Sequence, residues 1–286
     1  MALADPVAKY VTRLAQGGDI RRVTLGELAS HTSGLTRTPG EYEKWHRGPY
    51  SLADFIRYLN AWRADDQHLP GKQFLYSNSA FALLQLALQR RTGVAAGQLL
   101  QERLLARLGM NASAMPVPAG DSRGDIAPAL RARAVQGYGV GGRPIGQPGD
   151  EEGALDWPGT GQMYSSAQDM AQFLAANLGE IPGHRPLQQA MALAHQGVFA
   201  VNPRFTQALA WQVIRAGDHV LIDKNGGLDN TSTYIGFMPQ ERLGVVILIN
   251  RGKQRATRIG REILLDLAGS RASPSDEDGV DGVDGD

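Results

Sequence analysis

The chain has 286 residues, of which 42% are hydrophobic and 20% are charged, a composition typical of a globular protein with a sizeable core in one domain or two closely packed ones. It contains no cysteine, which excludes disulfides, thiolate metal sites and a cysteine nucleophile. The formal net charge is zero, yet residues 270–286 carry one basic and six acidic side chains, which leaves 28 basic and 23 acidic ones in residues 1–269. This small, scattered surplus gives no reason to expect nucleic-acid binding. No apolar run is long enough to span a membrane.

The start of the chain is predicted to be helical. Residues 1–4 lack the basic and apolar stretches of a secretory signal. From Thr24 a helix of about two turns is predicted, with Thr24 as N-cap, Glu27 completing a capping box and Gly34 as the stop signal. His31 lies next to serines at the end of this helix, but a catalytic Ser-His pair needs a defined geometry and a third orienting group. We therefore interpret His31 as a structural residue that ties down the loop after the helix.

The run Leu69–Phe81 contains the first candidate site. Pro70-Gly71 signals a turn, and Tyr76-Ser77-Asn78 stands just before an apolar helical pattern that Ser77 or Asn78 can cap. On such a first turn Tyr76 and Asn78 can point into one pocket, where free backbone N–H groups of the helix favour developing negative charge. This arrangement suits acyl-transfer chemistry, although so short a motif, taken alone, is more often a half-buried aromatic residue followed by a helix cap.

Four further helices are predicted from caps and apolar periodicity, over residues 51–65, 80–91, 96–108 and 164–174. Residues 116–161, before the last of them, are rich in glycine and proline. Gly137–Gly142 in this stretch matches G-x-G-x-x-G, but more prolines and glycines follow where a nucleotide site needs the N-terminus of a helix. We therefore interpret this motif as a hairpin or loop.

The last third is predicted to form consecutive antiparallel strands, over residues 208–216, 219–224, 232–238 and 243–250. A helix at about residues 255–267 is expected to cover this sheet with one apolar face. The residues of that face are Ile259, Ile263, Leu264 and Leu267. The tail from Ser270 lacks the apolar residues needed to fold and is predicted to be a disordered, solvating segment.

Asp223–Leu228 contains the second candidate site. Lys224 stands at the end of a predicted strand and is followed by Asn225, Gly226 and Gly227. Such an edge provides a cation, an amide and a backbone that a substrate can approach closely. It can hold an anionic substrate in extended pairing, while a backbone N–H forms half of an oxyanion hole. Taken alone, the pattern also fits a surface hairpin with a solvated lysine.

The motifs, taken in their order along the chain, closely resemble those of the class C β-lactamase and penicillin-binding serine hydrolase family. Each motif is weak alone, but their joint order and spacing are specific, and the resemblance runs from residue 1 to about residue 268. The motifs are Asp5-Pro6-Val7, His31-Thr32-Ser33-Gly34-Leu35, Pro70-Gly71, Tyr76-Ser77-Asn78, Leu108-Gly109-Met110, Tyr164–Met170 and Lys224-Asn225-Gly226.

The resemblance implies an α+β fold, in which a helical domain packs on an antiparallel sheet flanked by helices and the active site lies between them. The corresponding parts are a lead-in segment of the α/β region at 1–22, a mainly helical domain at 23–180 with Gly/Pro-rich loops at 116–161, an antiparallel sheet with a C-terminal helix at 181–268, and the acidic tail at 269–286. It also implies that the family's first sheet strands and nucleophile helix are missing from this chain.

The resemblance assigns Tyr76 and Lys224 as catalytic residues. Tyr76 matches the tyrosine that takes the proton of the nucleophile and later returns it, and Lys224 matches the lysine of the Lys-Thr-Gly strand motif. A nearby Lys224 would favour the phenolate form of Tyr76, which a phenol needs in order to act as a base near neutral pH.

Five positions are assigned to substrate binding. Asn78 matches the asparagine that binds the substrate amide, and the N–H of Gly227 matches an oxyanion-hole donor. Asn250 matches a residue near the substrate carboxylate, and Asn225 and Gly226 complete the binding strand.

Two departures from the family pattern affect the expected activity. Asn225 replaces a threonine whose hydroxyl usually holds the substrate carboxylate, which weakens the expectation of β-lactam specificity. The nucleophile of the family is the serine of a Ser-x-x-Lys motif, and no serine in this chain has a lysine three residues later. Since the motif belongs upstream of Asp5-Pro6-Val7, we expect the chain as given to be inactive.

Three functions stay open at this point: a β-lactamase-type serine hydrolase acting through an acyl-enzyme, an esterase or D-amino-acid peptidase of the same fold, and a non-catalytic remnant or ligand-binding module. The expected partner is a small β-lactam or a related amide or ester, without a cofactor, and the six scattered histidines have no pair at metal-ligand spacing on a helix. Complete relatives are periplasmic, whereas a chain without an export signal would stay in the cytoplasm. The oligomeric state is left open.

Overall fold

The computed structural model of the protein describes residues 1–40, 50–117, 124–150, 157–181 and 185–269, and the tail predicted to be disordered from Ser270 lies outside these ranges. The chain forms two compact units, each built from several stretches of sequence. The first unit contains Met1–Leu100, Met115–Asp125 and Leu155–Gln162, and the second contains Gln101–Ala114, Ile126–Ala154 and Met163–Asp286. The domain boundaries predicted after residues 22 and 180 fall inside the first and the second unit, respectively.

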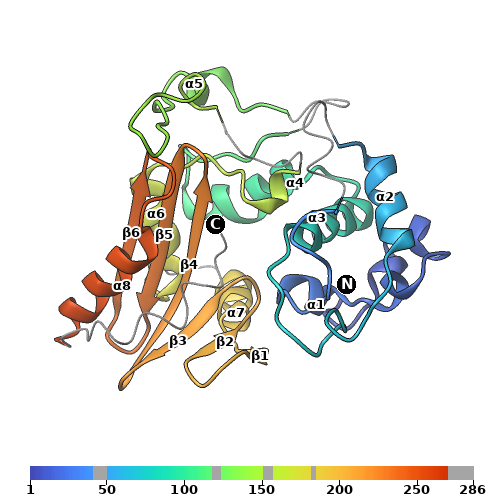
Figure 1. The fold of residues 1–286 in the computed structure, drawn as a ribbon. Helices are drawn as coiled ribbons and strands as arrows, with labels where there is room; N and C mark the ends of the chain where they lie inside the picture. Colours follow the sequence, from blue (N-terminus) through green and yellow to red (C-terminus); the bar gives the residue numbers. More distant parts are fainter. Residues whose placement is uncertain (41–49, 118–123, 151–156, 182–184, 270–286) are drawn as a thin grey trace. The chain divides into compact units, whose positions relative to one another are not determined.

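The first unit is helical (Figure 1). Its α-helices are α1 (Leu25–Ala29), α2 (Leu52–Ala61), α3 (Asn78–Thr92) and α4 (Ala96–Leu100), and its 3₁₀ helices are Val7–Lys9, Thr12–Leu14, Asp19–Arg22 and Pro158–Thr160. Apolar side chains from most of these segments form one core, whose completely buried members include Val7, Leu14, Ile20, Leu28, Leu59 and Leu83. Every helix in the described parts of the chain is too short or too polar to cross a membrane.

Side-chain caps fix where these helices begin. Thr24 Oγ1 accepts the Glu27 N–H at 3.2 Å while the Glu27 carboxylate accepts the Thr24 N–H at 2.7 Å, which is the predicted capping box. Ser51 and Ser77 cap α2 and α3, each by accepting the N–H three residues further on. Such caps contribute about 1 kcal/mol each, so these helix starts are defined by local sequence.

The described residues of the second unit form a six-stranded antiparallel sheet with the strands in chain order (Figure 1). The strands are β1 (Phe199–Ala200), β2 (Phe205–Gln207), β3 (Gln212–Ala216), β4 (His219–Leu228), β5 (Thr231–Met238) and β6 (Leu243–Ile249). The helical segments are η5 (Gln101–Leu105, a π-helical turn), η6 (Ala106–Leu108), α5 (Pro128–Arg131), α6 (Ala167–Asn177), α7 (Arg185–Ala194) and α8 (Ala256–Leu267). The predicted α+β fold class is therefore confirmed.

The two faces of the sheet are covered by different helices. Helix α8 lies on one face and α6 on the other (Figure 1). On the α6 side, Leu174 packs in a core with Ile222, Ile235 and Phe237. Since side chains alternate between the faces of a strand, Asp223 and Tyr234 point towards α8.

The apolar face predicted for α8 is only partly correct. Leu264 is fully buried, but three of its predicted members are exposed: Ile259 (40%), Ile263 (38%) and Leu267 (61%). Small residues of α8 face the sheet instead, because a Cβ atom at Gly260 would lie only 2.1 Å from the ring of Tyr234. The large side chains in this interface come from the sheet. The spacing of large apolar residues in the helix cannot reveal such an arrangement.

Strand β4 is longer than the sequence predicts. The predicted strand ends at Lys224, whereas β4 continues to Leu228 and the turn is formed by Asp229 and Asn230. The glycine pair at 226 and 227 therefore lies within the strand instead of forming the turn. The predicted strand over residues 208–216 is also different, since β2 ends at Gln207 and β3 begins only at Gln212.

His195, just after α7, is kept neutral by its surroundings. Its ring centroid lies 5.0 Å from that of Phe237 and 5.8 Å from that of Trp211, and its Nε2 lies 2.8 Å from Asn177 Oδ1. Burial lowers the pKa of His195 from 6.5 to about 4. The unfolded state therefore binds a proton at a higher pH than the folded state does, and stability falls as the pH decreases between these values.

We expect this histidine to make the protein acid-sensitive. Its titration should lower the free energy of unfolding by up to about 2 kcal/mol between pH 6.5 and 4, a value reduced because the ring is only partly buried. His195→Phe keeps an aromatic ring but cannot be protonated. Urea unfolding of both proteins across this range measures the effect, and a pH-independent difference between them would contradict it.

Candidate active site

The loop that follows α1 is hydrogen-bonded to the residues directly before and after Tyr76. The carbonyl oxygen of His31 accepts the Leu75 N–H at 2.8 Å, and its Nδ1 accepts the Ser77 N–H at 3.1 Å. His31 is 4% exposed, and its φ of +54° lies in the left-handed region. The interpretation of His31 as a structural residue that ties down this loop is confirmed.

The ring of Tyr76 contacts two side chains of the same loop. The His31 ring centroid lies 4.5 Å from that of Tyr76, with the ring planes at 36°. The guanidinium carbon of Arg37 lies 5.6 Å from the Tyr76 centroid, within the range of a cation–π interaction. The phenol is thus held at a defined place, with a permanent positive charge beside it.

The backbone N–H groups at the start of α3 are already hydrogen-bonded. The Asn78 and Ser79 N–H groups donate to the carbonyl oxygen of Arg37 at 2.9 and 3.1 Å, and the Ala80 N–H donates to Ser77 Oγ at 2.9 Å. The expectation that free N–H groups of this helix stabilise negative charge beside Tyr76 is therefore wrong. Near this phenol, the positive charge belongs to the Arg37 side chain.

Substitution of His31 tests its positioning role. We expect His31→Ala to lower the free energy of unfolding by about 2–4 kcal/mol, because the buried Ser77 N–H loses its acceptor and alanine disfavours a positive φ. His31→Asn should lose about half as much, since its amide oxygen can accept the same bond and asparagine tolerates this backbone conformation. Denaturant unfolding of the two variants checks this, and equal losses would show that ring packing dominates.

Strand β4 carries the second group of predicted residues. Lys224 is half-buried and pairs in register with Ile235, so its side chain starts from the α6 side of the sheet. Its Nζ donates to Asn225 Oδ1 at 2.5 Å. Asn225, which replaces the threonine expected from the resemblance, therefore orients the ammonium group of the neighbouring Lys224.

The outer edge of β4 changes character at Asp223. Strand β3 pairs with β4 only as far as Gln212 opposite Asp223, and no described strand pairs with this edge over residues 224–228. Leu228 and Thr231 flank a two-residue turn and form a hydrogen-bonded pair, so the alternation of an antiparallel ladder turns the N–H and C=O of Gly227 away from β5. Gly227 therefore presents its N–H at the edge that β3 leaves.

Asp223, the last residue of β4 that pairs with β3, belongs to a buried ionic network that the sequence does not predict. Arg261 Nε of α8 lies 2.7 Å from Asp223 Oδ2, and the hydroxyl of Tyr234 donates to the same oxygen at 3.1 Å. Arg261 also donates to Gln212 Oε1 at 3.3 Å. Burial and the Asp223 carboxylate raise the pKa of Tyr234 well above its usual value. The network joins β3, β4, β5 and α8 one residue before Lys224.

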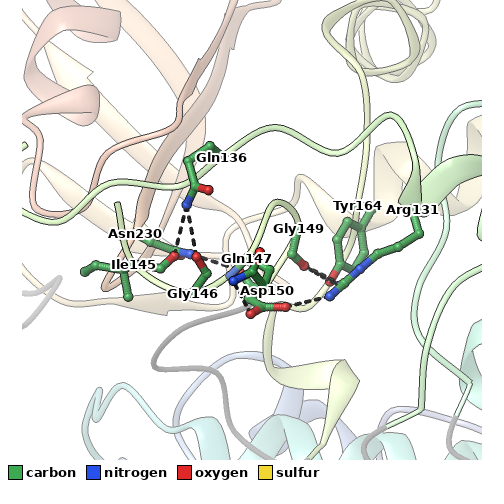
Figure 2. A network of polar contacts seen from close by, with 9 residues as sticks. All are labelled: Arg131, Gln136, Ile145, Gly146, Gln147, Gly149, Asp150, Tyr164 and Asn230. Atoms are coloured by element: carbon green, nitrogen blue, oxygen red, sulfur yellow. Dashed lines mark hydrogen bonds and ion pairs between the residues drawn. The ribbon is translucent and has the colours of Figure 1, made fainter. Parts of the chain in front are cut away.

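The loop over residues 134–150 is fastened by polar contacts, which Figure 2 shows. Arg131 donates to the carbonyl oxygen of Gly149 at 2.6 Å and forms an ion pair with Asp150, also at 2.6 Å. Gln136 Nε2 lies within reach of three carbonyl oxygens, at 2.8 to 3.3 Å. The Gly139 N–H donates back to the Arg143 carbonyl at 2.9 Å, which confirms that the glycine-rich motif forms a loop.

The same loop is attached to the ends of β4 and β6. Asn230, in the turn after β4, donates from Nδ2 to the carbonyl oxygen of Asp150 at 2.8 Å. Asn250, just after β6, donates from Nδ2 to the Gln136 carbonyl at 3.0 Å. Because Ser232 pairs with Gly227 on one side and with Ile249 on the other, Asn250 lies next to the row that contains Gly227.

The predicted site residues thus form two groups. Tyr76 and Asn78 lie together in the first unit, while residues 224–227 and Asn250 lie at neighbouring positions of the sheet in the second. Arg37 lies beside the first group and Asp223 beside the second. The role of each becomes visible only through a contact with a residue more than ten positions away in the sequence. The described residues contain no cluster of three or more His, Asp or Glu side chains that could hold a metal ion.

The fold is that of the β-lactamase and DD-peptidase class of enzymes. The beta-lactamase/D-alanine carboxypeptidase from Pseudomonas syringae matches over 94% of this chain and 78% of its own, with a TM-score of 0.78 and 22% identity, which shows the shared fold. A D-alanine carboxypeptidase from Burkholderia cenocepacia is 27% identical, with a TM-score of 0.75 over 94% of this chain and 77% of its own.

The family follows from the sequence profile of the Beta-lactamase family, which matches residues 1–269. The chain belongs to this family. A beta-lactamase from Pseudomonas fluorescens is 25% identical over 290 aligned residues, which cover 91% of this chain and 75% of that protein. The family membership predicted from the order of the motifs is confirmed.

Proposed function

We propose that this protein is a serine hydrolase of the class C β-lactamase type that opens β-lactams or related amides through an acyl-enzyme intermediate. In this mechanism Tyr76 accepts the proton of the attacking serine and passes it to the leaving nitrogen. Asn78 binds the amide of the substrate's acyl side chain. Lys224 assists the proton transfer through Tyr76 and attracts the carboxylate that the substrate carries outside this side chain. The N–H of Gly227 donates to the oxyanion of the tetrahedral intermediate.

The observation that carries this proposal is the edge of β4 beyond Asp223. Its N–H and C=O groups at Asn225 and Gly227 point away from β5, where an extended substrate can pair with them. Glycine at 226 and 227, both exposed, lets a substrate backbone approach without meeting a Cβ atom. Asn225 and Gly226 are therefore proposed to bind the substrate, and Asn250 to act near its carboxylate.

The test is acylation by a fluorescent penicillin, followed by intact mass. We place the nucleophile on a Ser-x-x-Lys motif outside these 286 residues, since none of their serines has a lysine three residues later. We expect no adduct on the 286-residue chain and a stoichiometric adduct on a form extended upstream to such a motif. The in-frame translation of the DNA upstream of Met1 identifies it. A stable adduct on the 286-residue chain would refute this placement.

The likeness to a D-alanine carboxypeptidase at 27% identity favours a second candidate, hydrolysis of a D-amino-acid peptide at the same site. Replacement of the family's threonine by Asn225 weakens the case for β-lactams and is compatible with peptide or ester substrates. An extended form that cleaves a D-alanyl-D-alanine peptide or a simple ester faster than penicillin would favour this candidate. Binding of penicillin by the extended form without any adduct would instead indicate a ligand-binding module. We place either activity in the periplasm, which the family resemblance implies.

A further inference from the structure

Arg37 lies beside both residues that the first unit contributes to the proposed reaction. Its guanidinium carbon is 5.6 Å from the ring centroid of Tyr76, and its side chain is exposed. Its carbonyl oxygen accepts the N–H of Asn78 at 2.9 Å. The backbone of Arg37 is therefore fixed to the residue assigned to the substrate amide, while its side chain reaches the phenol.

The base of this side chain is held firmly. The carbonyl oxygen of Thr36 accepts the Ser77 hydroxyl at 2.9 Å, and that of Arg37 accepts two N–H groups from the first turn of α3. These three hydrogen bonds join residues 36–37 to residues 77–79. A long side chain on such a base loses less entropy on binding than one on a mobile loop.

The chemistry of this group points to an anionic ligand. A guanidinium is charged at every physiological pH and can bind a carboxylate through two parallel hydrogen bonds. The first N–H groups of α3 are occupied by Arg37 and Ser77, so a negative group at this end of the helix meets the Arg37 side chain instead of the helix terminus.

We propose that Arg37 is a specificity-determining residue, which binds a carboxylate on the acyl side chain of the substrate. The inference rests on the proposed function, because Asn78 is assigned there to the amide of that side chain. Arg37, hydrogen-bonded to Asn78, is then next to the substituent that this amide carries. The preferred substrates are acyl amides or esters with a negatively charged acyl side chain.

The experiment compares two penicillins that differ by one carboxylate. Dissociation constants of benzylpenicillin and of carbenicillin, which adds a carboxylate to the same side chain, are measured by NMR titration of the 286-residue chain. We expect Arg37→Ala to weaken carbenicillin binding about five- to tenfold and benzylpenicillin binding less than about twofold. Arg37→Lys, which keeps the charge but loses the two-pronged geometry, should be intermediate for carbenicillin.

Arg91→Ala is the matched control, since it removes an exposed arginine from the C-terminal end of α3, the helix whose first turn Arg37 contacts. It should leave both dissociation constants unchanged. Equal weakening of the two penicillins by Arg37→Ala would overturn the inference and show that Arg37 only supports Tyr76, and no weakening of either would overturn it as well. If neither the 286-residue chain nor the form extended upstream binds either penicillin, the proposed function itself is refuted, and the inference with it.

Discussion

Replacing Arg261 by methionine is expected to lower the free energy of unfolding by about 3–5 kcal/mol, because the Asp223 carboxylate stays buried without its counter-charge. The Asp223 side chain is 0% exposed and that of Arg261 is 15% exposed, so water cannot take over the lost contacts. The Tyr234 hydroxyl, 3.1 Å from the carboxylate, is a neutral donor and cannot replace the charge. Urea unfolding at pH 7 measures the loss.

Two further variants separate charge burial from side-chain size. Arg258→Met removes an arginine from the same helix, where its ion pair with Glu262 is 3.1 Å long and about two-fifths exposed on both sides (42% and 39%), and should cost less than about 1 kcal/mol. Adding Asp223→Leu to Arg261→Met should recover most of the stability, since no unpaired charge is left. Equal losses for the two arginine variants would contradict the assignment.

Tyr76→Phe is expected to reduce the rate of penicillin hydrolysis by about 10²–10⁴-fold in the form extended upstream to a Ser-x-x-Lys motif, because phenylalanine cannot carry the proton of the nucleophile. Lys224→Ala should also cause a large loss. The double variant should lose less than the product of the two single losses, because both groups act on one transition state. Steady-state kinetics of the four proteins give this coupling.

Tyr10→Phe provides the matched control for the loss of a phenolic hydroxyl. Tyr10 lies in the same unit as Tyr76 and donates its hydroxyl to Asp5, outside the candidate site. We expect the Tyr10→Phe variant to hydrolyse penicillin at a rate within about twofold of that of the unaltered protein. If the losses at Tyr76 and Lys224 multiply, the two residues act independently, and the proposed mechanism would have to be abandoned.

Features that depend on residues close in sequence are well predicted here. The capping box of Thr24 and Glu27, the cap at Ser77 and the start of α6 after Ser166 all follow from spacings of three residues. The structural role of His31 could be inferred as well, but not its partners, since the N–H groups of Leu75 and Ser77 that it accepts come from a distant part of the sequence.

The errors have a common physical cause, since each involves residues brought together by the sheet or by a long loop. Glycines 226 and 227 resemble a turn, but pairing with β5 extends the strand through them. Ile259 of α8 has the spacing of a core residue, yet it is exposed. The sequence does not show that Tyr234 fills the space over Gly260.

The candidate site shows the same division. The motifs at Tyr76 and Lys224 could be found from local sequence and family resemblance. Arg37 could not be found in this way. Its role depends on its carbonyl oxygen, which accepts the N–H of Asn78, 41 residues later in the chain, and on the contact of its side chain with the Tyr76 ring. Asp223 and Arg261 likewise become partners only when α8 packs on the sheet.

The loop over residues 134–150 is held mainly through its carbonyl oxygens, to which Arg131 and Gln136 donate (Figure 2) and to which Asn250 donates as well. Carbonyl oxygens are the same in every residue type, and the side chain of Val140 at the loop tip is exposed (56%). Substitutions at the tip can therefore accumulate without detaching the loop. This makes positions 140, 141 and 143 suitable for randomised libraries, whereas Gly142 has to be kept, since its φ of +74° lies in the left-handed region.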